Sequence, residues 1–316
     1  MKIDGNTGRK IAEIILTIGI STILMLLGMY YIPWIILLYP APFIVLGVKY
    51  GLNYNIISII VSAFFIGLVT DNTSGIFVLL AFSPLSVSLN YLIANRKKPL
   101  ETMIITTLVS LASFLLILGL IKDMVGVSIV HQLDEFFTQT INTQIEGLKD
   151  MQMSHYEILQ VEDFLESAFD YVLLIIPSII MIFSLITAYL NYFVSSVMLR
   201  KIGYGIASIP RFSKFRLPSN ILLGTGIMFL GAFLLKWLKL SYYETVLLNI
   251  TVLATFMFFS QGLSVIDYRL IKRNIGRLFR ILILLFFIFV LPIGGIITFV
   301  GILDAIIDFR KFEKNA

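Results

Sequence analysis

Between Ile281 and Leu303 the chain reads ILILLFFIFVLPIGGIITFVGIL, 23 residues without one ionisable side chain. As a helix this stretch would be about 34 Å long, against roughly 30 Å for the hydrocarbon core of a bilayer. Eight or nine such stretches follow one another along the chain, and nearly every charge falls between them. The sequence therefore predicts an integral membrane protein.

The composition favours transmembrane helices over a β-barrel and excludes cysteine-dependent sites. Hydrophobic residues make up 58% and charged residues 14% of the chain, against roughly 45–50% and 25% in soluble domains. Barrel strands would alternate apolar and polar residues, whereas residues 114–121 read FLLILGLI. We expect an all-α, polytopic transmembrane helix bundle with eight or nine spans. Because the chain has no cysteine, disulfides, cysteine zinc sites and thiol catalysis are excluded.

Proline and glycine mark the irregular places among the predicted spans. The spans are residues 11–32, 34–49, 54–70, 75–94, 100–121, 168–199, 219–238, 245–268 and 281–306. Pro33, Pro40 and Pro42 predict a tight turn or a broken helix around the second span, because proline removes a helical hydrogen bond. Pro292-Ile-Gly294-Gly295 leaves two alternatives for the last span: a full crossing, which we slightly favour, or a re-entrant pair of helices.

Lysine and arginine are distributed unevenly between alternate loops. With a cytoplasmic amino terminus, 17 of the 24 lie inside, and the outside loops hold only Lys122, Lys149, Lys236 and Lys239. Because positive residues resist translocation, this pattern predicts a multi-pass protein of the cell membrane in that orientation. The net charge of +5 is then a topology signal that also attracts anionic headgroups of the lipid bilayer. It does not indicate a nucleic-acid partner.

Residues 122–166 form the one sizeable hydrophilic insertion, with nine carboxylates and two lysines. Apolar residues recur in it every three or four positions, as on one face of a helix: Leu133, Phe137, Ile141, Ile145 and Leu148. Ser154-His-Tyr-Glu157 has the form of a capping box. We expect an external amphipathic pair on the membrane or over the bundle, with a lid or a partner-docking site as the sharper alternative. His131 and His155 lie here beside acidic residues, but two scattered histidines favour solvent exposure over a metal site.

Neutral polar residues at membrane depth are the main candidates for a ligand site. Asp71 and Asn72 close the third span, Ser83, Ser86 and Asn90 lie in the fourth, and Asn191 lies in the sixth. Such residues commonly hydrogen-bond one helix to another. A proline beside serines, as at Pro84, can also expose backbone carbonyls to a cavity that binds a small ligand. We predict a polar pocket with Asp71 and Asn72 at its edge.

Ionisable groups deep in a bilayer are functional candidates because burying their charge is costly. Asp304 and Asp308 lie one turn apart near the end of the last span, followed by Arg310. Salt bridges or placement at the interface are the simpler interpretation, and a cation site is the alternative. The chain has no P-loop, H-E-x-x-H or G-x-S-x-G motif. We therefore predict a protein that is not an enzyme and that carries no cofactor or metal.

Proline and glycine spacing gives the chain a family resemblance. The stretch LYPAPFIVLGVKYG from Leu38 to Gly51, the polar fourth span, LPIGG at 291–295 and GILDAIIDFR from Gly301 to Arg310 resemble the YybS-like family of bacterial membrane proteins. That family is similar to the S components of energy-coupling-factor transporters and to the rod-shape protein MreD. The resemblance implies a six-helix S-component-like bundle over 1–199, which includes the insertion, and two to three further transmembrane helices with basic loops over 200–316. The first helix lacks the Ala-x-x-x-Ala face by which S components dock on an energising module.

Two functions follow from this comparison of residues and resemblance. The first is a protein that binds or helps transport a small molecule or lipid-like ligand held among the S-like helices. The second is an MreD-like membrane scaffold that recruits a membrane or cell-envelope protein partner, or a signalling partner, through the basic segments 200–216 and 269–280. We favour the first slightly, because of the polar residues between Asp71 and Asn90.

Overall fold

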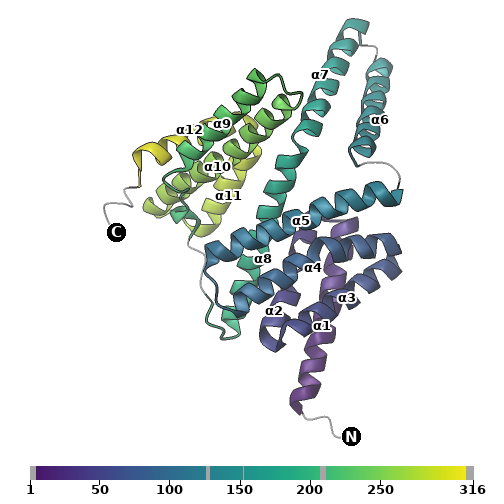
Figure 1. Cartoon of the computed structure of the whole chain (residues 1–316), viewed down its shortest axis with the longest axis vertical. Coiled ribbons are helices and arrows are strands. Elements are labelled where there is room, and N and C mark those ends of the chain that lie inside the picture. Colours follow the sequence, from purple (N-terminus) through teal and green to yellow (C-terminus); the bar gives the residue numbers. More distant parts are fainter. Residues whose placement is uncertain (1–4, 126–128, 152, 207–210, 311–316) are drawn as a thin grey trace. The chain divides into compact units, whose positions relative to one another are not determined.

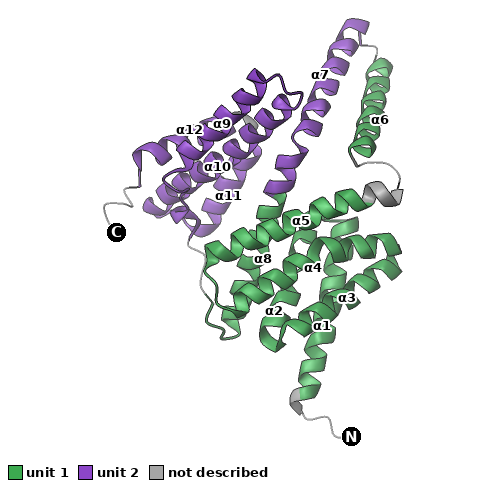
Figure 2. Cartoon of the chain, viewed as in Figure 1, with its two compact units in different colours: residues 1–151, 183–209 green, residues 152–182, 210–316 purple. Residues whose placement is uncertain are grey.

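The computed structural model describes residues 5–125, 129–151, 153–206 and 211–310. Within these residues every regular element is a helix. The helices form two compact units, which are residues 1–151 with 183–209 and residues 152–182 with 210–316 (Figure 2). Among the described residues seven segments are long and apolar enough to cross a membrane, or eight if the bent pair of helices at 277–289 and 294–307 is one span, against the eight or nine predicted. The prediction of an all-α polytopic membrane protein is therefore confirmed.

Unit 1 contains the first five helical segments of spanning length or near it, and then an amphipathic helix (Figure 1). Its elements are α1 (Gly5–Tyr30), the 3-10 helix η1 (Pro33–Leu38), α2 (Ala41–Tyr50), α3 (Leu52–Val69), α4 (Asn72–Ala94), α5 (Pro99–Val125), α6 (Ile129–Asp150) and the part of α8 (Ile176–Lys201) from Phe183 onward. The predicted break around the second span is present, because η1 and α2 replace one continuous helix there.

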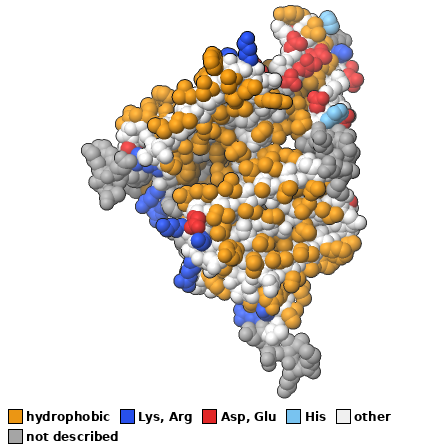
Figure 3. Space-filling model, viewed as in Figure 1, with side chains coloured by type: hydrophobic (Ala, Val, Ile, Leu, Met, Phe, Trp, Pro, Cys, Tyr) orange, Lys and Arg blue, Asp and Glu red, His pale blue; other side chains and the backbone are white. Residues whose placement is uncertain are grey.

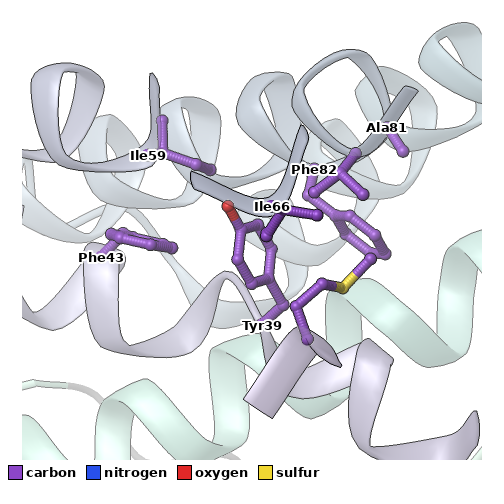
Figure 4. Close-up of a cluster of buried hydrophobic side chains, with 8 residues drawn as sticks. Tyr39, Phe43, Ile59, Ile66, Ala81 and Phe82 are labelled. Atoms are coloured by element: carbon purple, nitrogen blue, oxygen red, sulfur yellow. The ribbon is translucent and has the colours of Figure 1, made fainter. Parts of the chain in front are cut away.

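The core of unit 1 lies where η1, α2, α3 and α4 meet. Tyr39 is fully buried, and its ring packs edge-on against Phe43 and Phe82 at centroid distances of 5.2 and 5.7 Å. Ile59, Ile66 and Ala81 complete the labelled group in Figure 4, with Met25 and Val78 in the same cluster. A second cluster joins α2, α4 and α8, and it consists of Ile44, Val45, Leu85, Leu89, Ile93, Tyr192 and Leu199.

The hydrophilic insertion has the predicted apolar helix face. Ile141 and Ile145 are buried on α6, and the other three residues of the predicted face are half-buried. The capping box at the start of α7 is confirmed: the Ser154 hydroxyl accepts from the Glu157 N–H, and the Glu157 side chain accepts from the Ser154 N–H. This pairing satisfies two backbone donors that a helix start would otherwise leave free.

Unit 2 contains α7 (His155–Leu174), the first turns of α8, the short 3-10 helix η2 (Phe212–Lys214) and four further helices. These are α9 (Ile221–Trp237), α10 (Tyr243–Lys272), α11 (Arg277–Phe289) and α12 (Leu291–Ile307). The predicted last span at 281–306 is broken: the chain leaves helical geometry at Val290, and the flanking helices are bent by 110°. Proline fits the first turn of a helix but not its interior, so Pro292 starts α12 instead of continuing α11.

Two glycines allow α10 and α12 to touch along their backbones. A Cβ atom on Gly262 would lie 2.0 Å from the carbonyl oxygen of Ile297, and one on Gly301 would lie 1.8 Å from that of Phe258. Only glycine fits at such a crossing, which is the packing that small residues permit between membrane helices.

Large apolar side chains remain exposed along the helices of both units. On α5 they include Leu108, Leu115 and Leu116, which are 53–67% exposed. Hydrophobic side chains cover most of the face drawn in Figure 3, and acidic side chains gather over α6 and α7. A surface of this kind is expected where lipid is the solvent.

Candidate functional site

Asp71 and Asn72 lie at the junction of α3 and α4. Asp71 is the N-cap of α4: its carboxylate accepts hydrogen bonds from the Ser74 N–H at 2.8 Å and from the Ser74 hydroxyl at 2.5 Å. These hydrogen bonds, the hydroxyl first, hold the pKa of Asp71 below its ordinary value, because they favour the charged form. The side chain is exposed, so its observed role is to start the helix.

Ser86 and Asn90 lie in the interior of unit 1, on the opposite half of α4. The Ser86 hydroxyl donates to Asn55 Oδ1 at 3.0 Å, and Asn55 Nδ2 donates to the Ser86 carbonyl at 3.3 Å. Asn90 Nδ2 donates to the carbonyl of Ile44 at 3.1 Å. Ser83, one turn before, is half-buried. These bonds tie α4 to α3 and α2, and about 28 Å of helix separates Asn90 from Asp71.

Asn191 joins α8 to η1. Its Nδ2 donates to the carbonyls of Leu37 at 2.7 Å and Thr187 at 2.8 Å, while its side chain is fully buried. Its Oδ1 atom has no hydrogen-bond partner among the described residues. Asn191 therefore presents a buried acceptor that the structure leaves open.

Helix α5 carries hydroxyl side chains that the sequence prediction did not single out. Among its described side chains the buried ones are Thr102, Thr106, Ser110 and Ser113, which are at most 4% exposed. Ser113 donates to the Val109 carbonyl at 3.0 Å, but the other three hydroxyls have no partner among the described residues. The spacing of four, four and three residues places all of them on one helix face, and this spacing was the available signal.

Helices α5 and α8 meet within unit 1. The rings of Phe114 and Phe183 lie 5.4 Å apart, and Leu199 packs with Leu89 and Ile93 near the end of α4 from which α5 begins. An antiparallel course from the Phe114–Phe183 contact would place three buried polar residues of α8 level with the α5 hydroxyls. These residues are Thr187, Asn191 and Ser195. We call this pair of faces, with Thr102, Thr106 and Ser110 on α5 and Thr187, Asn191 and Ser195 on α8, the polar seam.

The predicted membrane-depth carboxylates meet Arg310 and α10 in unit 2. Asp304 and the Arg310 side chain are almost fully buried, with Arg310 Nη2 2.7 Å from Asp304 Oδ2. Gln261 Nε2 donates to the same oxygen at 2.8 Å, whereas Asp304 Oδ1 has no partner among the described residues. Asp308 Oδ2 lies 3.3 Å from Arg216 Nη1. The geometry is that of ion pairs that fix the end of α12.

Arg310 also fixes the segment before α9. Its Nη1 donates to the carbonyl of Ser213 at 3.0 Å and to the hydroxyl of Ser264 at 2.7 Å. Ser264 in turn donates to the carbonyls of Phe212 and Phe215. The guanidinium therefore connects α10, α12 and η2.

The histidines are not brought to a common site. His131 pairs with Glu135 one turn along α6 at 3.3 Å, and His155 is exposed at the start of α7. Across the described ranges no group of three or more His, Cys, Asp or Glu residues could hold a metal ion.

The family comparison covers nearly the whole of this architecture. The family described as "Predicted membrane protein (DUF2232)" matches residues 19–305, which run from α1 to α12. No curated protein and no solved structure matches the chain. The apolar helices and the family agree on an integral membrane protein. The chain belongs to the DUF2232 family of predicted membrane proteins.

Proposed function

We propose that this protein binds a small, uncharged polar molecule in the polar seam of unit 1, as a binding or transport protein and not as an enzyme. The observation that carries the proposal is the polarity of α5, whose buried face is made of hydroxyls and whose exposed face is made of leucine and isoleucine. The orientation with a cytoplasmic amino terminus and the S-component-like and YybS-like character of 1–199 remain part of this proposal.

Unpaired polar atoms are costly inside a membrane protein. An unsatisfied buried hydroxyl costs about 1–3 kcal/mol, and in lipid no bulk solvent relieves it. The seam contains four unpaired polar atoms, which are the hydroxyls of Thr102, Thr106 and Ser110 and the Oδ1 atom of Asn191. A ligand that both donates and accepts hydrogen bonds would satisfy them.

The chemistry of the seam restricts the ligand class. Its polar groups are hydroxyls, which donate and accept, and the acceptor Asn191 Oδ1. No Lys, Arg, Asp or Glu lies among the buried described residues of α5 or α8. An amide or hydroxyl compound without net charge matches this lining better than an ion does, because a buried ion needs an opposite charge.

Thermal unfolding of the purified full chain tests the proposal. A panel of vitamins, nucleosides and lipid precursors should contain a compound that raises the melting temperature, since a ligand that binds only the native state stabilises it. In the Thr106→Val, Ser110→Ala variant that rise should disappear. The melting temperature without ligand should stay equal or increase, because the variant removes unpaired polar groups.

The matched control is Thr251→Val on α10. The Thr251 hydroxyl is exposed and donates to the carbonyl of Leu247 at 2.8 Å, so its removal should leave the ligand response intact. A response that survives in the seam variant, or a panel without any response, contradicts the proposal.

One observation supports the alternative function as a membrane scaffold. Arg273 and Arg277 are exposed at the turn between α10 and α11, and neither forms an ion pair among the described residues. Arg273→Glu with Arg277→Glu should then abolish capture of an envelope or signalling protein from cross-linked cells, while the seam variant should not. Unchanged capture in the arginine variant contradicts this second function.

A further inference from the structure

Two cavities adjoin at the carboxyl end of α10 in unit 2. The first, about 280 Å³, is lined by Tyr268, Arg269, Lys272, Phe309 and Arg310. The second, about 430 Å³, is lined mainly by the aliphatic residues Val265, Ile266, Leu270, Val300 and Leu303, with Arg273 at its edge. Arg269 and Phe309 line both. A basic cavity therefore continues into an apolar one.

The basic cavity has an excess of positive charge. Each nearby carboxylate is already held by another arginine: Asp267 by Arg280 at 3.4 Å, Asp304 by Arg310 and Asp308 by Arg216. Arg269 and Lys272, by contrast, form no ion pair within the part of the chain that the structure describes. An anion in this cavity would meet two cations that no carboxylate neutralises.

The inner wall of the basic cavity is fixed in place. Asp308 has the left-handed conformation, with φ 49° and ψ 67°, and it ends α12 so that the chain turns back on α10. After this turn Phe309 and Arg310 line the cavity. The Arg310 guanidinium donates hydrogen bonds there to the Asp304 carboxylate and the Ser213 carbonyl. A preformed wall lowers the entropy lost when a ligand binds.

The cavities also lie at the right depth for a headgroup. Helix α10 has 30 residues, or about 45 Å, which exceeds a hydrocarbon core of roughly 30 Å. Arg269 and Lys272 occupy its last turn, and the aliphatic cavity extends from this turn to Val265 and Ile266 in the turn before. The charged half is thus at the level of lipid phosphates, and the apolar half at the level of acyl chains.

We infer that unit 2 binds one anionic phospholipid, with its phosphate against Arg269 and Lys272 and the start of an acyl chain between α10 and α12. This site is independent of the polar seam in unit 1. Charge complementarity selects the phosphate, and the continuity of the two cavities selects a lipid over a free anion.

Native mass spectrometry of the detergent-solubilised full chain tests the inference. Dioleoylphosphatidylglycerol should bind as one retained molecule, and dioleoylphosphatidylcholine should bind weakly. Arg269→Gln with Lys272→Gln should lower the affinity for the anionic lipid roughly thirtyfold, from the loss of two basic contacts. Arg269→Lys with Lys272→Arg keeps both charges and should retain most of the binding, which separates a lost site from a misfolded protein.

The matched control is Lys97→Gln with Lys98→Gln, which removes two exposed cations beside α5. It should leave the retained lipid unchanged. An equal loss in this control, or equal retention of phosphatidylcholine, would show a nonspecific lipid annulus and overturn the site. Competition by millimolar inorganic phosphate as effective as that by the lipid would show a free-anion site and overturn the lipid assignment.

Discussion

Arg310 and Asp304 show how a pair of charges can be held inside a membrane protein. The two side chains are 1% and 0% exposed, and Gln261, Ser264 and the Ser213 carbonyl surround them with hydrogen bonds. Burial of charge is tolerated because each group has an opposite partner and further polar contacts. The pair therefore connects η2 to the end of α12.

Removing one member of this pair should be more harmful than removing both. Arg310→Met leaves Asp304 buried without its cation, and we expect a loss of about 3–5 kcal/mol in the free energy of unfolding. Arg310→Met combined with Asp304→Leu should recover much of that loss, because apolar side chains of similar volume often replace a buried pair at little cost. Chemical unfolding in detergent measures both variants. A double variant as unstable as the single one would contradict this account.

Asp71 makes the start of α4 sensitive to acid. Its pKa is lowered in the folded protein, so its contribution to stability is complete above the ordinary value near 3.9. That contribution is lost as the pH falls through the lower folded value. The protection factor of the Ser74 amide, which is its hydrogen-exchange rate compared with the intrinsic rate at the same pH, should therefore fall at acid pH in the native chain. In Asp71→Asn, which keeps an N-cap without a titrating group, this acid dependence should be absent. An identical pH profile in both proteins would show that the cap does not respond to acid.

Close contact between helices α10 and α12 depends on two glycines. Gly301→Ala would force a Cβ atom to 1.8 Å from the Phe258 carbonyl, so the helices must separate. We expect a loss of several kcal/mol, as for a severely overpacked core, measured by chemical unfolding.

Gly295→Ala is the matched control on the same helix. No atom lies within 4 Å of its Cβ position, and alanine favours helix over glycine by roughly 0.5–1 kcal/mol. This variant should be as stable as the native chain or more so. Equal stability of the two alanine variants would show that α10 and α12 do not touch as described.

The elements differ in how far the sequence predicts them. Length and hydropathy predict the spans, because a helix must be long and apolar to cross lipid, and the Ser154 capping box is a local signal. The break at Val290 is harder to predict from the sequence, since Pro292 with Gly294 and Gly295 fits both a kinked span and two separate helices. Hydropathy averages over a helix and therefore hides which face is polar. For this reason hydropathy does not predict the buried hydroxyl face of α5, although Thr102, Thr106 and Ser110 are spaced by about one helical turn.

The same limit applies to the predicted ligand residues. Ser86, Asn90 and Asn191 were selected as polar groups at membrane depth, and each makes hydrogen bonds between helices in the structure. Composition cannot show that Asn191 keeps one acceptor open while Asn90 donates to Ile44, because this depends on neighbours distant in sequence. Ligand binding at Asn191 is part of the seam proposal, and ligand binding at Ser86 and Asn90 stays a prediction.

Because the chain has no cysteine, single introduced cysteines can test the proposed orientation of the protein in the membrane. Lys97→Cys introduces an exposed thiol between α4 and α5, and Lys236→Cys introduces one near the end of α9. With a cytoplasmic amino terminus, a membrane-impermeant maleimide should label Lys236→Cys in intact cells and Lys97→Cys only after permeabilisation. The reverse pattern would invert the orientation, and labelling of both in intact cells would mean an even number of crossings between them in place of the three assigned spans.

The hydroxyl face of α5 also constrains the order of assembly during synthesis. Fifty residues separate the end of α5 from the start of α8, so α5 leaves the ribosome well before the helix that would complete the proposed seam. Until α8 has been made, the nascent α5 must keep this face toward the insertion machinery or toward α4, on which it packs. Closure of the amino-terminal bundle is therefore a late, non-local event, which makes it slow relative to the pairing of neighbouring helices.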